Sequence, residues 1–156
     1  TEEKFLIQLF TELQEKKNVR SNLSALRASL KEATEEQKAQ AIEFVRGHED
    51  LVFGFLQEED AKTRKNAALL LGDLAVQNAL QPLWKAYTRE QTLFVKSAYL
   101  EAMKALHAEE ILSQLKDRLA ELEGEPVTEE NRKHREAELR ALRAILIQYE
   151  GIDTHH

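Results

Sequence analysis

Residues 56–74 read Leu-Gln-Glu-Glu-Asp-Ala-Lys-Thr-Arg-Lys-Asn-Ala-Ala-Leu-Leu-Leu-Gly-Asp-Leu. A short acidic turn ends at Asp60, whose carboxylate is well placed to accept the first free backbone N–H groups of a helix. Apolar residues then recur at helical spacing, and they are Ala67, Ala68, Leu70, Leu71 and Leu74. Because they cover more than half of the helix circumference, residues 60–77 are predicted to form a central helix that is contacted on several sides.

The composition fits one soluble domain rich in amphipathic helices, with 156 residues, 32% of them charged and 42% hydrophobic. The absence of Cys excludes disulfides, thiolate catalysis and zinc–thiolate sites. No apolar run approaches the roughly 18 residues that would span a bilayer, and the first four residues lack the features of a signal peptide. We therefore expect a cytoplasmic protein that does not enter a membrane.

The apolar pattern predicts further helices on both sides of the central one. They are expected over residues 2–15, 19–33, 34–47, 51–56, 79–87, 92–106, 111–123 and 128–149. The short link between the first two makes them an antiparallel hairpin.

Local signals mark several of the predicted helix ends. Asn18 is a candidate cap for the second helix, and Thr34 with Gln37 has the spacing of a capping box. Gly47 is expected to separate two helices, and Gly151 to close the last one.

Residues 92–106 repeat the pattern of residues 60–74. Moving them back by 32 positions places Thr92 on Asp60 and keeps the apolar positions in register. The helices that precede these two segments align at the same shift. A single shift that relates two consecutive helix pairs indicates a tandem repeat.

Asp60, Thr63-Arg64, Ala67-Ala68 and Leu71-Gly72 together resemble the second helix of a HEAT-like repeat of the PBS-lyase type. The resemblance implies an all-α fold, a right-handed α-solenoid of about four HEAT-like helix pairs.

The resemblance also implies boundaries along the chain. Residues 1–152 would form a single repeat domain, and residues 153–156, which include His155 and His156, would be a tail or tag remnant. Within the domain, the segments are a degenerate capping pair over 1–33 and repeats over 34–78, 79–108 and 109–150.

Three polar residues receive a structural role from the same resemblance. Arg64 and Lys96 occupy the position at which HEAT-like repeats carry a basic residue that bridges neighbouring repeats. Their partners would lie in acidic turns, such as the turn that ends at Asp60. We expect this role in joining repeats rather than a role in binding a ligand.

The side of these helices that the apolar core leaves free is a candidate partner-binding surface. Its residues are Lys62, Lys65, Leu69 and Asp73 in the central helix, and Phe94, Ser97 and Glu101 in the next repeat. In a HEAT-like stack they would line the concave face, where Leu69 and Phe94 would be apolar residues surrounded by charge, as in a binding patch. The alternative is that bundle curvature or an extra helix buries both.

The sequence contains no pattern typical of a catalytic, cofactor-binding or metal-binding site. His48, His107 and His134 are far apart, which indicates positions at helix ends or on the surface. Adjacent Glu pairs fall mostly at predicted helix starts, where negative charge suits the helix dipole. The five Gly are scattered singly and form no phosphate-binding loop. We therefore expect neither a cofactor nor an enzyme.

The densest basic segment is residues 132–135, Arg-Lys-His-Arg, followed by Arg140 and Arg143. Acidic residues interleave with it at helical spacing, which favours a solvated face held by ion pairs. Contact with RNA phosphates is the alternative, although the net charge of −6 argues against strong RNA binding.

These patterns favour a non-catalytic scaffold that binds a protein or peptide through its concave face. A second resemblance supports an alternative, and it rests on residues 64–74, 91–97 and 149–152. Together they resemble the helical N-terminal region of some bacterial RNA methyltransferases that carry THUMP and Rossmann-type domains downstream. That resemblance implies an accessory domain that docks on its own enzyme or positions RNA. A HEAT-like DNA-repair enzyme is a distant third reading, and it would need a concave cleft lined by aromatic residues such as Trp84 and Tyr87.

Overall fold

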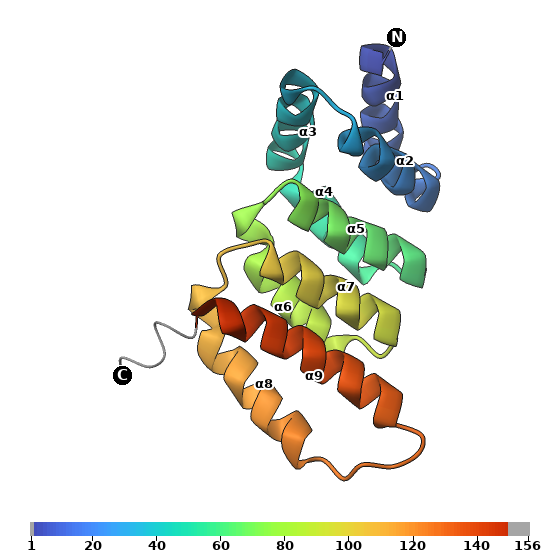
Figure 1. Cartoon of the computed structure of the whole chain (residues 1–156). Helices are drawn as coiled ribbons and strands as arrows, with labels where there is room; N and C mark the ends of the chain where they lie inside the picture. The colour runs from blue at the N-terminus through green and yellow to red at the C-terminus, as the bar shows by residue number, and fades with distance from the viewer. Residues whose placement is uncertain (1, 150–156) are drawn as a thin grey trace.

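The computed structural model describes residues 2–149, with side chains from Lys4 onward (Figure 1). All regular structure in this range is helical. The α-helices are α1 (Glu2–Gln14), α2 (Val19–Lys31), α3 (Glu35–Gly47), α4 (Glu49–Gly54), α5 (Ala61–Asp73), α6 (Leu80–Arg89), α7 (Leu93–Lys104), α8 (Leu112–Gly124) and α9 (Arg132–Leu146). Short 3₁₀ turns are η1 (Phe55–Gln57), η2 (Gln77–Ala79), η3 (Glu109–Ile111) and η4 (Ile147–Tyr149).

Four helices, α2, α5, α7 and α9, lie side by side in one row that follows their order in the chain (Figure 1). Helix α5 packs against α2 on one side and α7 on the other, and α7 packs in turn against α9. Helix α6 lies behind α7 in Figure 1 and α8 lies beside α9 at the end of the row, and each contacts the row helix that follows it in the chain. Direct contacts join α1 to α2, α6 to α7 and α8 to α9, and we call these helix pairs, with α3, α4 and α5 as the remaining group; successive row helices also contact one another.

The core runs along the row because each row helix buries apolar residues on several sides. In α5, Ala67, Ala68 and Leu71 have no exposed surface, and Leu70 retains only 1%. Gly72 allows α5 to approach α7 closely, since a Cβ built there would lie 2.9 Å from the Cα of Ala102. The prediction that α5 is central and contacted on several sides is confirmed.

The cap predictions have mixed outcomes. At α3, the Gln37 backbone N–H donates to Thr34 Oγ1 at 3.1 Å and the Thr34 N–H donates to Gln37 Oε1 at 3.0 Å, so the capping box is confirmed. At α5, Asp60 accepts the backbone N–H of Thr63 at 2.9 Å. The prediction for Asn18 is wrong: its side chain caps nothing, because the residue adopts a left-handed conformation with φ of 46°.

Two helix boundaries differ from the prediction by four residues. Helix α5 ends at Asp73 rather than near residue 77, because Ala75 adopts a left-handed conformation with φ of 52°. The N–H groups of Ala75 and Val76 then bond back to the carbonyls of Gly72 and Leu71, as in a Schellman motif. Helix α9 begins at Arg132 rather than at residue 128, since residues 129–131 form a turn.

The predictions for Gly151, His155 and His156 lie outside the described residues. No helix between residues 2 and 149 combines the length and apolar character needed to cross a membrane.

Candidate partner-binding site

The predicted partner-binding residues lie on α5 and α7, which are neighbours in the row (Figure 1). We call them the α5–α7 patch: Lys62, Lys65, Leu69, Asp73, Phe94, Ser97 and Glu101. Phe94 is 46% exposed, and Leu69 is half-buried. The alternative in which both apolar residues are buried therefore does not hold for Phe94.

The polar residues of the patch differ in how far they are engaged. Lys62 and Glu101 are exposed, and Lys65 and Ser97 are half-buried. Asp73 accepts from Arg27 of α2, with Nε and Oδ2 2.8 Å apart. Because this ion pair joins α2 to α5, Asp73 contributes to packing as well as to the surface.

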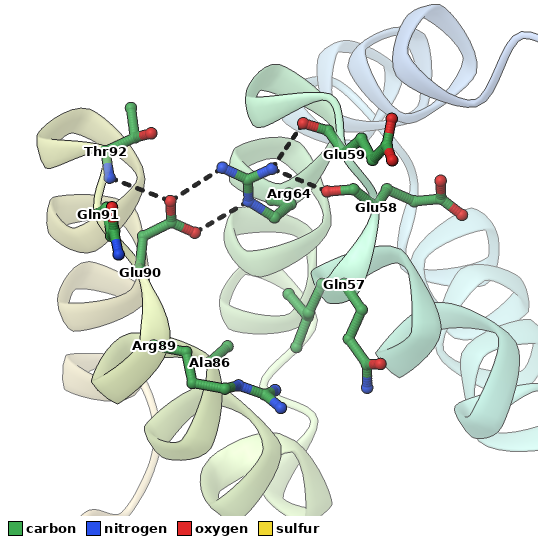
Figure 2. Close-up of a pocket in the computed structure, with 10 residues that line it drawn as sticks. Gln57, Glu58, Glu59, Arg64, Ala86, Arg89, Glu90, Gln91 and Thr92 are labelled. Atoms are coloured by element: carbon green, nitrogen blue, oxygen red, sulfur yellow. Dashed lines mark hydrogen bonds and ion pairs between the residues drawn. The ribbon is translucent and has the colours of Figure 1, made fainter.

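Arg64 of α5 reaches Glu90, in the turn before α7 (Figure 2). Its Nε and Nη2 donate to Oε1 and Oε2 of Glu90, both at 2.9 Å. Its Nη1 donates to the backbone carbonyls of Glu58 and Glu59, both at 2.8 Å. The hollow in Figure 2, about 430 Å³ in volume, is therefore lined by a guanidinium that already has protein partners.

Glu90 is the buried end of this contact, with 5% of its side chain exposed. It also accepts the Thr92 backbone N–H at 3.1 Å and the Tyr99 hydroxyl at 3.0 Å. Burial alone would raise the pKa of Glu90, but these donors and Arg64 outweigh it and hold the pKa below its ordinary value. Burial raises the pKa of the Tyr99 hydroxyl, and the adjacent charge of Glu90 adds to the effect.

Asp60 caps α5 as expected, but its partner in a neighbouring helix pair is Arg20 rather than Arg64. It accepts the Thr63 hydroxyl at 2.7 Å, and it lies 3.5 Å from Arg20 of α2. The hydrogen bond from the Thr63 side chain lowers the pKa of Asp60. The acidic partner of Arg64 is therefore Glu90, in the turn before α7, while Asp60 caps α5 and faces the preceding pair.

Lys96 makes the corresponding contact one pair further along. Its Nζ lies 3.1 Å from Oε1 of Glu138 in α9 and 5.2 Å from the centre of the Tyr87 ring. Glu138 also accepts Nε of Arg118 at 2.9 Å and the hydroxyl of Tyr87. Burial would raise the pKa of Glu138, but Arg118, Tyr87 and Lys96 together keep it below its ordinary value.

Arg135 of α9 repeats half of the Arg64 arrangement. Its Nε and Nη2 donate to the carbonyls of Leu122 and Glu123 at the end of α8, both at 3.2 Å. Among the residues that the structure describes, no carboxylate forms an ion pair with Arg135. Arg135 therefore joins α9 to α8, the two helices of one pair, and does not connect them to another pair.

Sequence reasoning missed five members of these networks: Glu90, Tyr99, Arg118, Arg135 and Glu138. One signal was present, because Glu90 coincides with Glu58 at the 32-residue shift. Glu138 gave no such signal, since the longer loop before α9 breaks the register of the repeat.

The other candidate residues are dispersed. His48 is half-buried and stacks on Phe44 at 4.5 Å, while His107 and His134 are exposed. Between residues 2 and 149, no group of three or more His, Asp or Glu side chains is arranged to hold a metal ion. In the basic segment, Arg132 lies 3.6 Å from Glu129 on an exposed surface.

The aromatic residues Trp84 and Tyr87 belong to α6, behind the row. Tyr87 is 2% exposed and Trp84 is half-buried, with 5.4 Å between their ring centres. They border a hollow of about 360 Å³ together with residues of α8. This hollow is lined by α6, α8 and Lys96 of α7, and it contains no residue of the α5–α7 patch.

No protein-family model matches this chain, and no curated protein or solved structure matches it either.

Proposed function

We propose that this chain is a non-catalytic scaffold, a right-handed α-solenoid of about four HEAT-like helix pairs that binds a protein or peptide. Its partner would lie on the face formed by the second helices of the pairs, with the α5–α7 patch at the centre. The buried titratable groups hold helix pairs together. The solvent-facing side of the row helices is therefore the surface left for recognition.

The contacts between successive pairs support the repeat part of this proposal. Arg64 reaches Glu90 and Lys96 reaches Glu138, so a basic residue near the start of one second helix meets a carboxylate of the next pair. Gly72 adds a close approach between α5 and α7. Such nearest-neighbour contacts are typical of stacked repeats and give a rigid surface.

The exposure of Phe94 is the observation that carries the binding proposal. A large aromatic side chain that is 46% exposed loses little conformational entropy when a partner covers it. Half-buried Leu69 lies on the neighbouring helix α5, and Lys62 and Glu101 are exposed charged residues of the same two helices. An apolar centre with a polar rim is the usual anatomy of a protein-binding surface.

Selection of peptides from a display library on the purified chain, followed by NMR mapping, tests this proposal. Selected peptides should shift the amide signals of Leu69, Phe94 and Ser97, and they should lose affinity for Phe94→Ser. Val127→Ser is the matched control, since Val127 is 53% exposed in the loop before α9. Peptides that map elsewhere, or that bind Phe94→Ser and wild type equally, would contradict it.

Arg135 favours a second candidate function, that of an accessory domain which docks on another domain of an RNA-modifying methyltransferase. In the two preceding pairs, the corresponding cation meets a carboxylate of the following pair. Arg135 keeps the carbonyl contacts, and no carboxylate within residues 4–149 pairs with it. A neighbouring domain with an acidic residue would complete the arrangement.

The coding sequence that contains this chain tests the second candidate. If it continues into a methyltransferase domain, the two parts should bind each other when expressed separately. Arg135→Glu should weaken that binding, whereas Arg46→Glu, on the exposed side of α3, should not. A coding sequence without such a domain would rule this candidate out.

A further inference from the structure

A groove of about 440 Å³ lies between α2, α3 and the C-terminal end of α5. Its floor is apolar: Leu30 and Leu74 are each 7% exposed, and Ile42 of α3 is half-buried. A volume of this size falls within the range of pockets that hold small ligands, about 300–1,000 Å³. The groove therefore has room for large apolar side chains of a partner.

Positive charge surrounds this floor. Arg27 and Lys31 come from α2, and Lys38 comes from the first turns of α3. The one carboxylate in the lining is Asp73, and Arg27 already neutralises it at 2.8 Å. Lys38 is 3.7 Å from Glu35, whose side chain is 95% exposed, so this pair is weak and easily exchanged.

The walls of the groove are held apart by contacts made elsewhere. Helix α3 is attached through α4 and through Phe44, whose ring stacks on Phe10 of α1 at 4.5 Å. Helix α2 is attached to α5 by the ion pairs of Arg20 and Arg27. The groove is therefore preformed, and a partner need not separate packed helices to enter it.

We propose that this groove binds an acidic amphipathic helix of another protein. The apolar side chains of that helix would occupy the floor of Leu30, Ile42 and Leu74, and its carboxylates would pair with Lys31 and Lys38. Helices that lay an apolar face into a groove are a recurrent mode of recognition, and charge around the groove selects the partner. The positive rim contrasts with the net charge of −6 of the whole chain, so it marks one place where an acidic partner is attracted.

The site is distinct from the α5–α7 patch, with which it shares only Asp73. The inference does not depend on the proposed function, because the patch contains Phe94 and the groove does not. NMR mapping separates the two surfaces directly.

The experiment titrates the ¹⁵N-labelled chain of residues 1–156 with three designed peptides of about 15 residues. The first is an acidic helix former with Leu at positions i, i+3, i+4 and i+7 and Glu elsewhere. The second keeps Leu and replaces Glu by Lys, and the third keeps Glu and replaces Leu by Ser. The first should shift the amides of Leu30, Ile42 and Leu74 and bind at least about fivefold more tightly than either of the others.

Two protein variants test the role of the rim. Lys31→Glu/Lys38→Glu should weaken binding of the acidic peptide at least about fivefold. The control, Lys85→Glu/Lys104→Glu, has the same net charge and reverses two exposed lysines outside the groove, so it should change the affinity less than about twofold. Amide spectra of all variants report whether the fold is retained.

Three results would overturn the proposal. The first is no binding of the acidic peptide up to about 1 mM. The second is equal binding of the Lys peptide, or shifts that fall on the α5–α7 patch instead of the groove. The third is that an RNA oligonucleotide of about 15 nucleotides shifts the amide signals of the same groove residues as strongly as the acidic peptide does. The groove would then bind polyanions in general.

Discussion

Arg64 and Glu90 form two parallel hydrogen bonds, both 2.9 Å long, between one helix pair and the next. Their side chains are 16% and 5% exposed. Such a bidentate pair fixes direction as well as distance, because the guanidinium and the carboxylate are both planar. The contact therefore sets how α5 lies relative to the turn before α7.

Replacing Arg64 should destabilise the protein strongly. In Arg64→Met the carboxylate of Glu90 stays buried and loses its cation, and the carbonyls of Glu58 and Glu59 lose their donor. We expect the free energy of unfolding in urea to fall by about 3 kcal/mol, the low end for a broken buried pair, because solvent reaches Arg64 from the adjoining hollow.

Two further variants make that measurement specific. Arg64→Lys keeps the charge but cannot form both bonds, so its loss should lie between zero and that of Arg64→Met. Arg46→Met, on the exposed side of α3, should change the free energy of unfolding by less than about 0.5 kcal/mol. Equal effects of Arg64→Met and Arg46→Met would show that the Glu90 contact does not stabilise the fold.

Glu90 and Glu138 should make the stability depend on pH. The pKa of each is lower in the folded protein than the ordinary value of 4.5. Their contribution to stability is therefore fully present above pH 4.5, and it is lost as the pH falls through the lower folded values. Urea unfolding at a series of pH values should show the free energy of unfolding decreasing below this point.

The double variant Glu90→Gln/Glu138→Gln should be less stable at pH 7 and should show a shallower decrease in acid. Glu43→Gln/Glu130→Gln, which changes two exposed carboxylates, is the matched control and should retain the wild-type slope. A double variant at Glu90 and Glu138 with the full wild-type slope would mean that other carboxylates control acid unfolding.

The sequence was sufficient to predict the positions of the helices because these depend on local periodicity. The 32-residue shift brought Arg64 and Lys96 to equivalent places, and both reach a following pair. The repeat shift offered a signal only for Glu90. Glu138 could not be predicted, since it meets Lys96 only through the way that α7 and α9 pack together. The end of α5 was missed because Ala75 adopts a left-handed conformation without Gly or Asn to signal it.

The candidate surface was predicted only in outline. Spacing placed Leu69 and Phe94 on the free side of their helices, but it could not decide whether another helix covers them. The groove beside α3 was not predicted at all, because α3 reaches its position through a stack between Phe10 and Phe44 that no short-range pattern encodes.

Gly72 should be intolerant of a side chain because of its contact with α7. A Cβ at this position would lie 2.9 Å from Ala102 Cα and 3.2 Å from its Cβ, so two helix backbones would have to separate. Gly72→Ala should lower the free energy of unfolding by about 1–3 kcal/mol, despite the better helix propensity of Ala.

Gly54 provides the matched control. It lies in α4 with φ of −62°, and a Cβ there would meet no atom within 4 Å. Gly54→Ala should therefore raise the free energy of unfolding by about 0.4–1 kcal/mol. If thermal and urea unfolding showed both Ala variants to be stabilised, α5 and α7 would not be as close as the structure places them.

Ala75 should respond to substitution in the opposite sense from Gly72. It is exposed and has φ of 52°, a conformation in which the Cβ of an L-residue is strained and Gly is not. Ala75→Gly should raise the free energy of unfolding by about 0.5–1 kcal/mol, because relief of this strain exceeds the added entropy of the unfolded chain.

Ala105→Gly is the control for this prediction. Ala105 is also exposed at a helix end, but its φ is −75°, so its replacement by Gly should lower the free energy of unfolding by about the same amount. Urea unfolding of both variants under one condition measures the difference in sign. A loss of stability in Ala75→Gly would mean that the Schellman motif does not end α5 in solution.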